Sequence, residues 1–139
     1  MSKLVRFGVS LDETLLNKFD PYISRLGYRS RSEAIRDLIR ERLVDEEWKS
    51  GKEAAMGVLS LVYDHDVREL SRKLTDIQHH HLGTILSTTH VHMDEHNCLE
   101  VVILKGTART IQEVAGLLLS ARGVKHGKLI TTTTGKHLD

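Results

Sequence analysis

Apolar side chains alternate with polar or small ones in the segment from residue 3 to residue 10. Successive side chains of a β-strand point to opposite faces, so the alternation predicts a half-buried strand. The apolar face holds Val5, Phe7 and Val9, and the other face holds Arg6, Gly8 and Ser10. No second strand pattern follows nearby, so this strand has no partner close to it in the sequence.

Two helices are predicted after this strand. From residue 12 to residue 26 apolar residues recur at helical spacing behind Asp12 and Glu13, and Gly27 ends the pattern. The run Ser30-Arg31-Ser32-Glu33 is the capping-box signature of a helix N-terminus. It opens a second apolar stripe that reaches Leu43.

One strand and two helices cannot bury a core or satisfy the strand's own hydrogen-bonding groups. The simplest remedy is a dimer in which two chains pair their first strands into an antiparallel ribbon. Such a ribbon fits the major groove of B-DNA, with Arg6, Gly8 and Ser10 facing the bases. Ser30 and Arg31, at the start of the second helix, are then placed to bind phosphate.

The pattern changes after residue 53. Strands are predicted over residues 56–63, 83–93, 98–104 and 124–134, and helices over 66–78 and 111–122. The order β-α-β-β-α-β is that of a ferredoxin-like domain, in which both helices cover one face of a four-stranded antiparallel sheet. The open face of such a sheet can receive a second chain, which favours a dimer of dimers.

We therefore expect an α+β protein of two domains. Residues 1–48 form a DNA-binding domain of the β-α-α type, residues 49–53 a linker, and residues 54–139 the ferredoxin-like domain. The sequence Lys49-Ser50-Gly51-Lys52 is typical of a linker.

The composition of the 139 residues narrows the class of protein. No stretch approaches the ~20 apolar residues of a membrane span, and the first residues lack the apolar core of a signal peptide. We therefore expect a cytoplasmic protein without a membrane partner. Aromatic residues make up 4%, which argues against stacking of single-stranded bases and favours duplex DNA as the partner. A single cysteine cannot form an internal disulfide and is free to bind metal.

Six of the nine histidines and the only cysteine fall between residues 79 and 98. His90 and His92 share one face of a predicted strand, and Cys98 follows a turn that could return it beside them. Imidazole and thiolate suit nickel, copper, zinc or cobalt, so we expect a transition-metal site. The fourth donor stays open at this point, because each residue of the run His79-His80-His81 competes for it.

Several motifs resemble the nickel-responsive transcriptional regulators, the NikR family. They are Arg-Ser-Glu-Ala-Ile-Arg-Asp-Leu-Ile-Arg at 31–40, Gln-His-His-His at 78–81, His-Val-His at 90–92, Asn-Cys-Leu-Glu at 97–100 and Arg-Gly-Val-Lys-His-Gly at 122–127. The resemblance implies a ribbon-helix-helix domain joined to an ACT-like regulatory domain, assembled as a homotetramer on operator DNA.

The resemblance also implies roles for particular residues. Nickel, one ion per subunit, is expected in a roughly planar site made by His90, His92 and Cys98 of one subunit and His79 of another. The remaining roles are support of these ligands by Glu100, a second cation at Glu33 and Asp37, base reading by Arg6, Gly8 and Ser10, and a phosphate contact by Arg68. Gly8 departs from the family pattern because it offers no side chain for base reading.

The resulting hypothesis is a repressor in which metal binding promotes operator binding. The alternative is a metal-buffering or structural-zinc protein whose first half serves only to oligomerise, since tetrahedral zinc accepts the same donors. A hydrolase with Cys98 as nucleophile is a third class, but no oxyanion-stabilising motif accompanies the cysteine. We therefore expect no enzyme.

Overall fold

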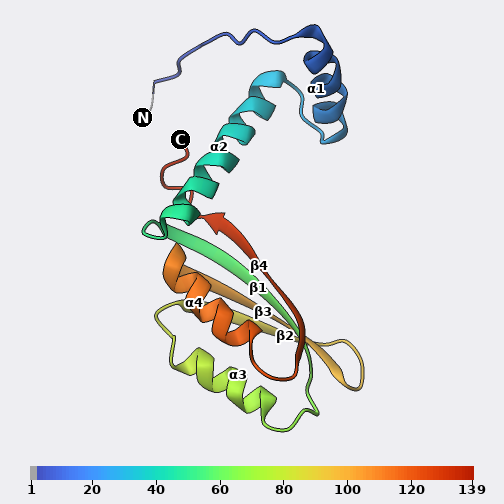
Figure 1. Ribbon diagram of the computed structural model, residues 1–139, viewed down its shortest axis with the longest axis vertical. Helices are drawn as coiled ribbons and strands as arrows, with labels where there is room; N and C mark the ends of the chain where they lie inside the picture. The colour runs from blue at the N-terminus through green and yellow to red at the C-terminus, as the bar shows by residue number, and fades with distance from the viewer. Residues whose placement is uncertain (1–2) are drawn as a thin grey trace. The chain divides into compact units, whose positions relative to one another are not determined.

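The computed structural model describes residues 3–139. Their contacts divide the chain into two compact units (Figure 1). One unit runs up to Leu43 and includes Leu138 and Asp139, and the other spans Val44–His137. Each unit is described separately below.

The two predicted amino-terminal helices are present, as α1 (Glu13–Arg25) and α2 (Arg31–Ser50). The Asp12 carboxylate caps α1 by accepting the backbone N–H of Thr14 at 2.9 Å. At the start of α2, the Ser30 hydroxyl accepts the N–H of Glu33 at 3.2 Å. These contacts satisfy amides that have no partner within the helix, so the helices begin where the sequence signals predict.

Helix α2 continues through Lys49 and Ser50, and Gly51 follows it with a φ of 69°. The helix therefore includes the first two residues of the segment predicted as a linker. Across residues 3–139, no helix combines the length and apolar character needed to cross a membrane.

The segment before α1 forms no β-strand in the single chain that the structure describes. The strand predicted over residues 3–10 is absent because the hydrogen bonds of a strand need a second strand beside it. Its apolar side chains are open to solvent, with Val5 72% and Phe7 71% exposed.

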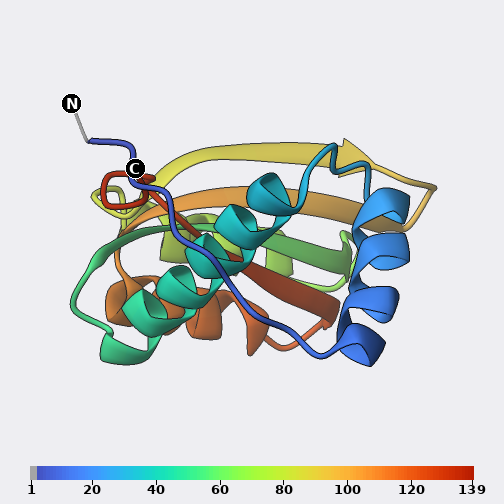
Figure 2. The ribbon, with the colours of Figure 1, turned by 90° about the horizontal axis from the view of Figure 1, so that it is seen from above.

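The carboxy-terminal unit has the predicted order β-α-β-β-α-β. Its elements are β1 (Ala54–Asp64), α3 (Leu70–His79), β2 (Ile85–His92), β3 (Asn97–Thr107), α4 (Ala108–Leu119) and β4 (Val124–Thr133). The strands lie in the order β2-β3-β1-β4, and all neighbouring pairs are antiparallel (Figure 2). This arrangement confirms the ferredoxin-like prediction.

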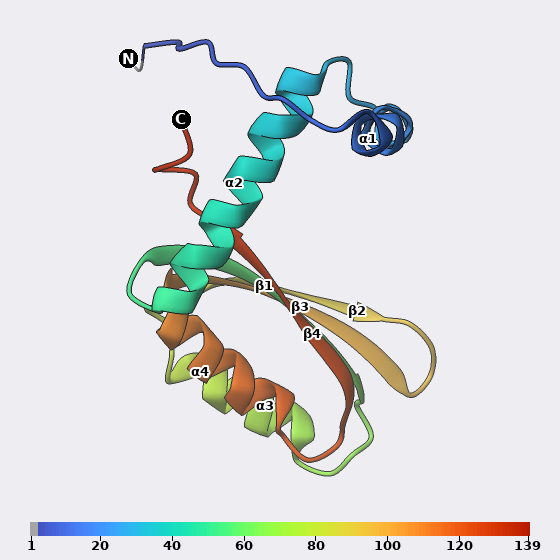
Figure 3. The same ribbon diagram turned by 45° about the horizontal axis from the view of Figure 1, so that its top comes forward.

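Helices α3 and α4 both cover one face of this sheet (Figure 3). Burial alternates along β1, because every second side chain points toward the helices. The core consists mainly of aliphatic residues from both layers, among them Leu59, Leu61, Leu74, Val102, Leu104, Ile111 and Leu118. The layers meet so closely that a Cβ at Gly127 would clash with a Leu119 methyl group, which explains the glycine there.

Helix α3 begins at Leu70, four residues after the predicted start at Asp66, so that prediction was wrong. The Asp66 carboxylate does not cap the helix, because it contacts the His96 ring at 2.6 Å. Its backbone N–H donates instead to the Asp64 carboxylate at 2.8 Å. The residue before α3 is Glu69, which has a left-handed φ of 65° and makes no side-chain cap.

Candidate functional site

Strand pairing places three of the four predicted metal ligands on two neighbouring strands. In the register of the β2–β3 hairpin, His92 lies opposite Cys98 and His90 lies opposite Glu100. Tyr63 of β1 lies opposite Cys98 on the other side of β3. These positions all place their side chains on the face of the sheet that carries the helices. Because β2 is an edge strand, its two imidazoles are exposed, whereas the thiol is buried.

The Cys98 thiol lies between two imidazoles. Its Sγ is 3.4 Å from Nδ1 of His92 and 3.3 Å from Nδ1 of His65. Burial, and after it the negative charge of Asp64, raises the pKa of this thiol. Metal binding requires loss of that proton, so the site favours the thiol in the absence of metal and the thiolate only when a cation is present.

The His90 ring completes this group of side chains. Its centroid is 4.9 Å from that of His92, and its Nδ1 is 3.2 Å from the Tyr63 hydroxyl. The Tyr63 pKa is raised, first by burial and then by the Glu100 carboxylate, so the hydroxyl stays protonated and can donate to His90. The structure thus places His92 beside Cys98 and His90 beside His92, but the nitrogens of His90 are not among the donors that converge with the thiol.

His65 was not assigned a role from the sequence, yet it belongs to this group. The donor atoms of His65, His92 and Cys98 all lie within 4.8 Å of one another. His65 follows the end of β1, and only the β1–β3 register shows that this end lies beside Cys98. The donors are imidazole and sulfur without a carboxylate, which fits a transition metal rather than magnesium or calcium.

A carboxylate links His65 to His96. Asp66 Oδ1 is 3.3 Å from His65 Nε2, and Asp66 Oδ2 is 2.6 Å from His96 Nδ1. The bond with His96 lowers the pKa of Asp66, and the same bond raises the pKa of His96. His96 is therefore engaged by Asp66 at the hairpin turn, as a surface residue that does not contact Cys98.

Glu100 is the one buried charged residue among residues 3–139, with 7% of its surface exposed. Its Oε1 accepts a hydrogen bond from Gln78 Nε2 at 3.0 Å. The amide oxygen of Gln78 in turn accepts the Thr88 hydroxyl at 2.8 Å. One glutamine in the last turn of α3 is therefore bonded to both strands that carry the predicted metal ligands.

The three adjacent histidines differ in their surroundings. His80 Nδ1 is 2.7 Å from the carbonyl oxygen of Asp76, so that ring is held against its own helix. His79, the last residue of α3, is exposed and its ring forms no hydrogen bond with any residue in the range 3–139. His79 is not among the donors that converge within one chain.

The predicted DNA-contacting residues of the first unit are exposed. Arg6, Gly8 and Ser10 lie in the segment before α1. Ser30 caps α2, and the Arg31 guanidinium is already paired with Asp20, through contacts of 2.9 and 2.8 Å. A phosphate at Arg31 would thus have to share this side chain with a carboxylate.

The two acidic residues predicted to hold a second cation both have protein partners. Glu33 Oε2 accepts the N–H of Arg29 at 3.4 Å. Asp37 accepts the Tyr28 hydroxyl at 2.7 Å and lies 3.4 Å from the Arg40 guanidinium.

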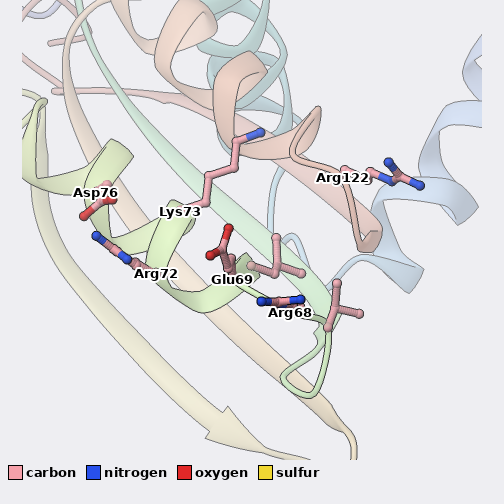
Figure 4. A pocket seen from close by; sticks show the side chains of 8 residues that line it. Arg68, Glu69, Arg72, Lys73, Asp76 and Arg122 are labelled. Atoms are coloured by element: carbon pink, nitrogen blue, oxygen red, sulfur yellow. The ribbon is translucent and has the colours of Figure 1, made fainter.

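Arg68 borders a basic cleft of about 550 Å³ at the start of α3 (Figure 4). Arg72, Lys73 and Arg122 also line this cleft. None of these four cations forms an ion pair with another residue of the described chain. Of these four residues, only Arg68 was predicted from the sequence to contact DNA. Arg122 is distant from it in the sequence, and only the fold brings it to the same cleft.

Comparison with known proteins identifies the family. Residues 56–132 match the model "NikR C terminal nickel binding domain", and residues 5–46 match "Ribbon-helix-helix protein, copG family". A Geotalea uraniireducens protein called "Putative nickel-responsive regulator" is 54% identical over 138 residues, which is 99% of each chain. The chain belongs to the NikR family of nickel-responsive regulators. A Pyrococcus furiosus relative of the same name is 54% identical over 97% of this chain and 98% of its own length.

Membership of the NikR family makes the chain a nickel-binding and DNA-binding transcription regulator and not an enzyme. An uncharacterized protein from Thermotoga maritima shares the fold of part of the chain, with a TM-score of 0.51 and 22% identity. The match covers 57% of this chain and 98% of that protein.

Proposed function

We propose that this NikR-family protein is a repressor that binds operator DNA when it holds nickel. The observation that carries the proposal is the position of Cys98, whose sulfur lies 3.4 Å from Nδ1 of His92, a ring that in turn lies 4.9 Å from the His90 ring on the same edge strand. The proposed assembly is a homotetramer, a dimer of dimers, with one nickel ion per subunit.

The proposed ligands are His90, His92 and Cys98 of one subunit and His79 of another. His79 suits this role because its ring is exposed and forms no hydrogen bond within residues 3–139, whereas His80 is engaged with a carbonyl of its own helix. When bound, nickel would link donor atoms of two subunits. Glu100 lies opposite His90 and supports the ligands from beside the site.

The amino-terminal unit supports pairing with a second copy. Ile23 and Ala34 are its only buried apolar residues within the described range. An apolar cleft of about 620 Å³ lies open in the single unit, with Leu15, Phe19 and Leu38 among its lining. A second chain would cover this surface and supply the partner strand for residues 3–10.

In the proposed DNA complex the paired strands enter the major groove. Base reading then depends on Arg6 and Ser10, since Gly8 contributes only backbone. Ser30, Arg31 and Arg68 contact phosphates. Glu33 and Asp37 remain our proposed second cation site, in which a cation would compete with their present partners.

Metal and operator binding are linked in this proposal. If the metal-bound assembly binds operator DNA more tightly, then DNA must raise the affinity for metal by the same factor. The free energy for this coupling comes from the ligand bonds across subunits, which stabilise one conformation of α3 relative to the strands.

Fluorescence anisotropy with labelled operator DNA tests the function. We expect tight binding with stoichiometric nickel and weak binding with a chelator, and equal affinity in both would contradict the proposal. Arg6→Ala should abolish specific DNA binding while nickel affinity is unchanged. Arg109→Ala, an exposed arginine on α4, is the matched control and should leave specific binding intact.

One observation favours a second candidate, a metal-buffering or structural-zinc protein. His65, His92 and Cys98 offer three converging donors without a second subunit, which suits tetrahedral zinc. Absorption spectra of the nickel and cobalt forms separate the two functions. Planar nickel–thiolate bands support the regulator, and a tetrahedral pattern for both metals supports the zinc role.

A further inference from the structure

We infer that Gln78 is a positioning residue that sets the direction in which His79 is presented to the neighbouring subunit. The inference rests on the proposed role of His79 as a ligand across the subunit boundary. It extends that role to a residue that does not itself bind metal.

Two hydrogen bonds fix the Gln78 side chain. Its amide N–H₂ donates to Glu100 on β3 at 3.0 Å, and its amide oxygen accepts from Thr88 on β2 at 2.8 Å. Both ends of the amide are therefore used, and the side chain cannot rotate without breaking both contacts. The last turn of α3 is thereby attached to the two strands of the metal site.

The bond to Glu100 is strong because of where that carboxylate lies. Glu100 is 7% exposed, so its charge has little access to water. A buried carboxylate without a donor carries a large desolvation cost, and a hydrogen bond to a charged acceptor is stronger than a neutral one. The structure therefore favours keeping Gln78 in place.

His79 immediately follows Gln78 and ends the helix. The last turn of a helix frays readily because its carbonyl groups lack partners within the helix. Neighbouring Cα atoms are separated by a fixed distance of about 3.8 Å, so a fixed Gln78 limits how far His79 can move. Without this restraint, the imidazole must be ordered at the moment of metal binding, which weakens binding.

The same contact joins the two kinds of ligand. Thr88 and His90 share one face of β2, two residues apart, and Glu100 lies opposite His90 in the β2–β3 register. The ligands on the strands of one subunit, and the helix ligand that this subunit donates to its neighbour, are thus both held in position by strands β2 and β3. Gln78 is the side chain that spans them.

The test compares nickel affinity in the full-length Gln78→Ala, His79→Ala and double variants, measured by competition with a chelator of known affinity. Gln78→Ala should weaken nickel binding about 10-fold to 100-fold, the range typical for a residue that orients a ligand. In the His79→Ala background the same change should cost less than about 2-fold, because non-additivity marks residues that act through one another. Gln112→Ala, an exposed glutamine on α4, is the control and should have no effect.

Equal losses from Gln78→Ala in both backgrounds would overturn the inference, since a merely structural role does not depend on His79. If His79→Ala weakens nickel binding and Gln78→Ala does not, only the inference fails. If His79→Ala leaves nickel binding unchanged, the proposed fourth ligand fails and the inference falls with it. Should Gln78→Ala not fold, Thr88→Val removes one of the two hydrogen bonds and should give a smaller loss that again depends on His79.

Discussion

Replacing Cys98 by alanine should separate metal binding from folding. The side chain is fully buried, and the change removes one heavy atom, which corresponds to about 1 kcal/mol of unfolding free energy. Four-ligand zinc sites bind with about 10–16 kcal/mol, so one ligand accounts for about 3 kcal/mol. Nickel affinity should therefore fall about 100-fold or more, while the metal-free protein stays folded.

Val102→Ala is the matched control, because Val102 lies on the same face of β3 and is equally buried. It should lower the unfolding free energy by about 1.5–3 kcal/mol and leave nickel affinity unchanged. Urea unfolding of the metal-free proteins and chelator competition measure the two quantities. The reasoning is refuted if Cys98→Ala retains wild-type nickel affinity, or if Val102→Ala loses as much affinity as Cys98→Ala.

Two further changes test the packing and the electrostatics. Gly127→Ala should destabilise the protein by about 1–3 kcal/mol in urea unfolding, because its Cβ would meet Leu119, whereas Gly116→Ala has open space and should not destabilise. The neighbouring Arg31 guanidinium lowers the pKa of Asp20 below 3.8. The stabilisation from Asp20 is therefore complete above about pH 4 and is lost as the pH falls through the lower pKa of the folded state. Asp20→Asn should thus unfold more easily than wild type at pH 7, and this difference should shrink as the pH falls below 4; a difference that does not change with pH would contradict the ion-pair explanation.

Local signals in the sequence predicted much of the fold. Asp12 and Ser30 mark helix starts that the structure confirms, because capping depends on residues only two or three positions away. The order β-α-β-β-α-β was also readable, since each element has its own apolar period. The start of α3 was predicted wrongly, because aspartate is a typical N-cap residue but Asp66 bonds instead to His96, 30 residues further along the chain.

Within the candidate metal site, the sequence by itself determined the pair His90 and His92, because alternation along one strand puts them on one face. Cys98 joined them through a short hairpin, which is also a local feature. Only the tertiary structure showed that His65 lies 3.3 Å from the cysteine sulfur and that Gln78 bonds to Glu100. These contacts join separate elements, and their register is decided by packing of the whole sheet and its helices, which no short stretch of sequence contains.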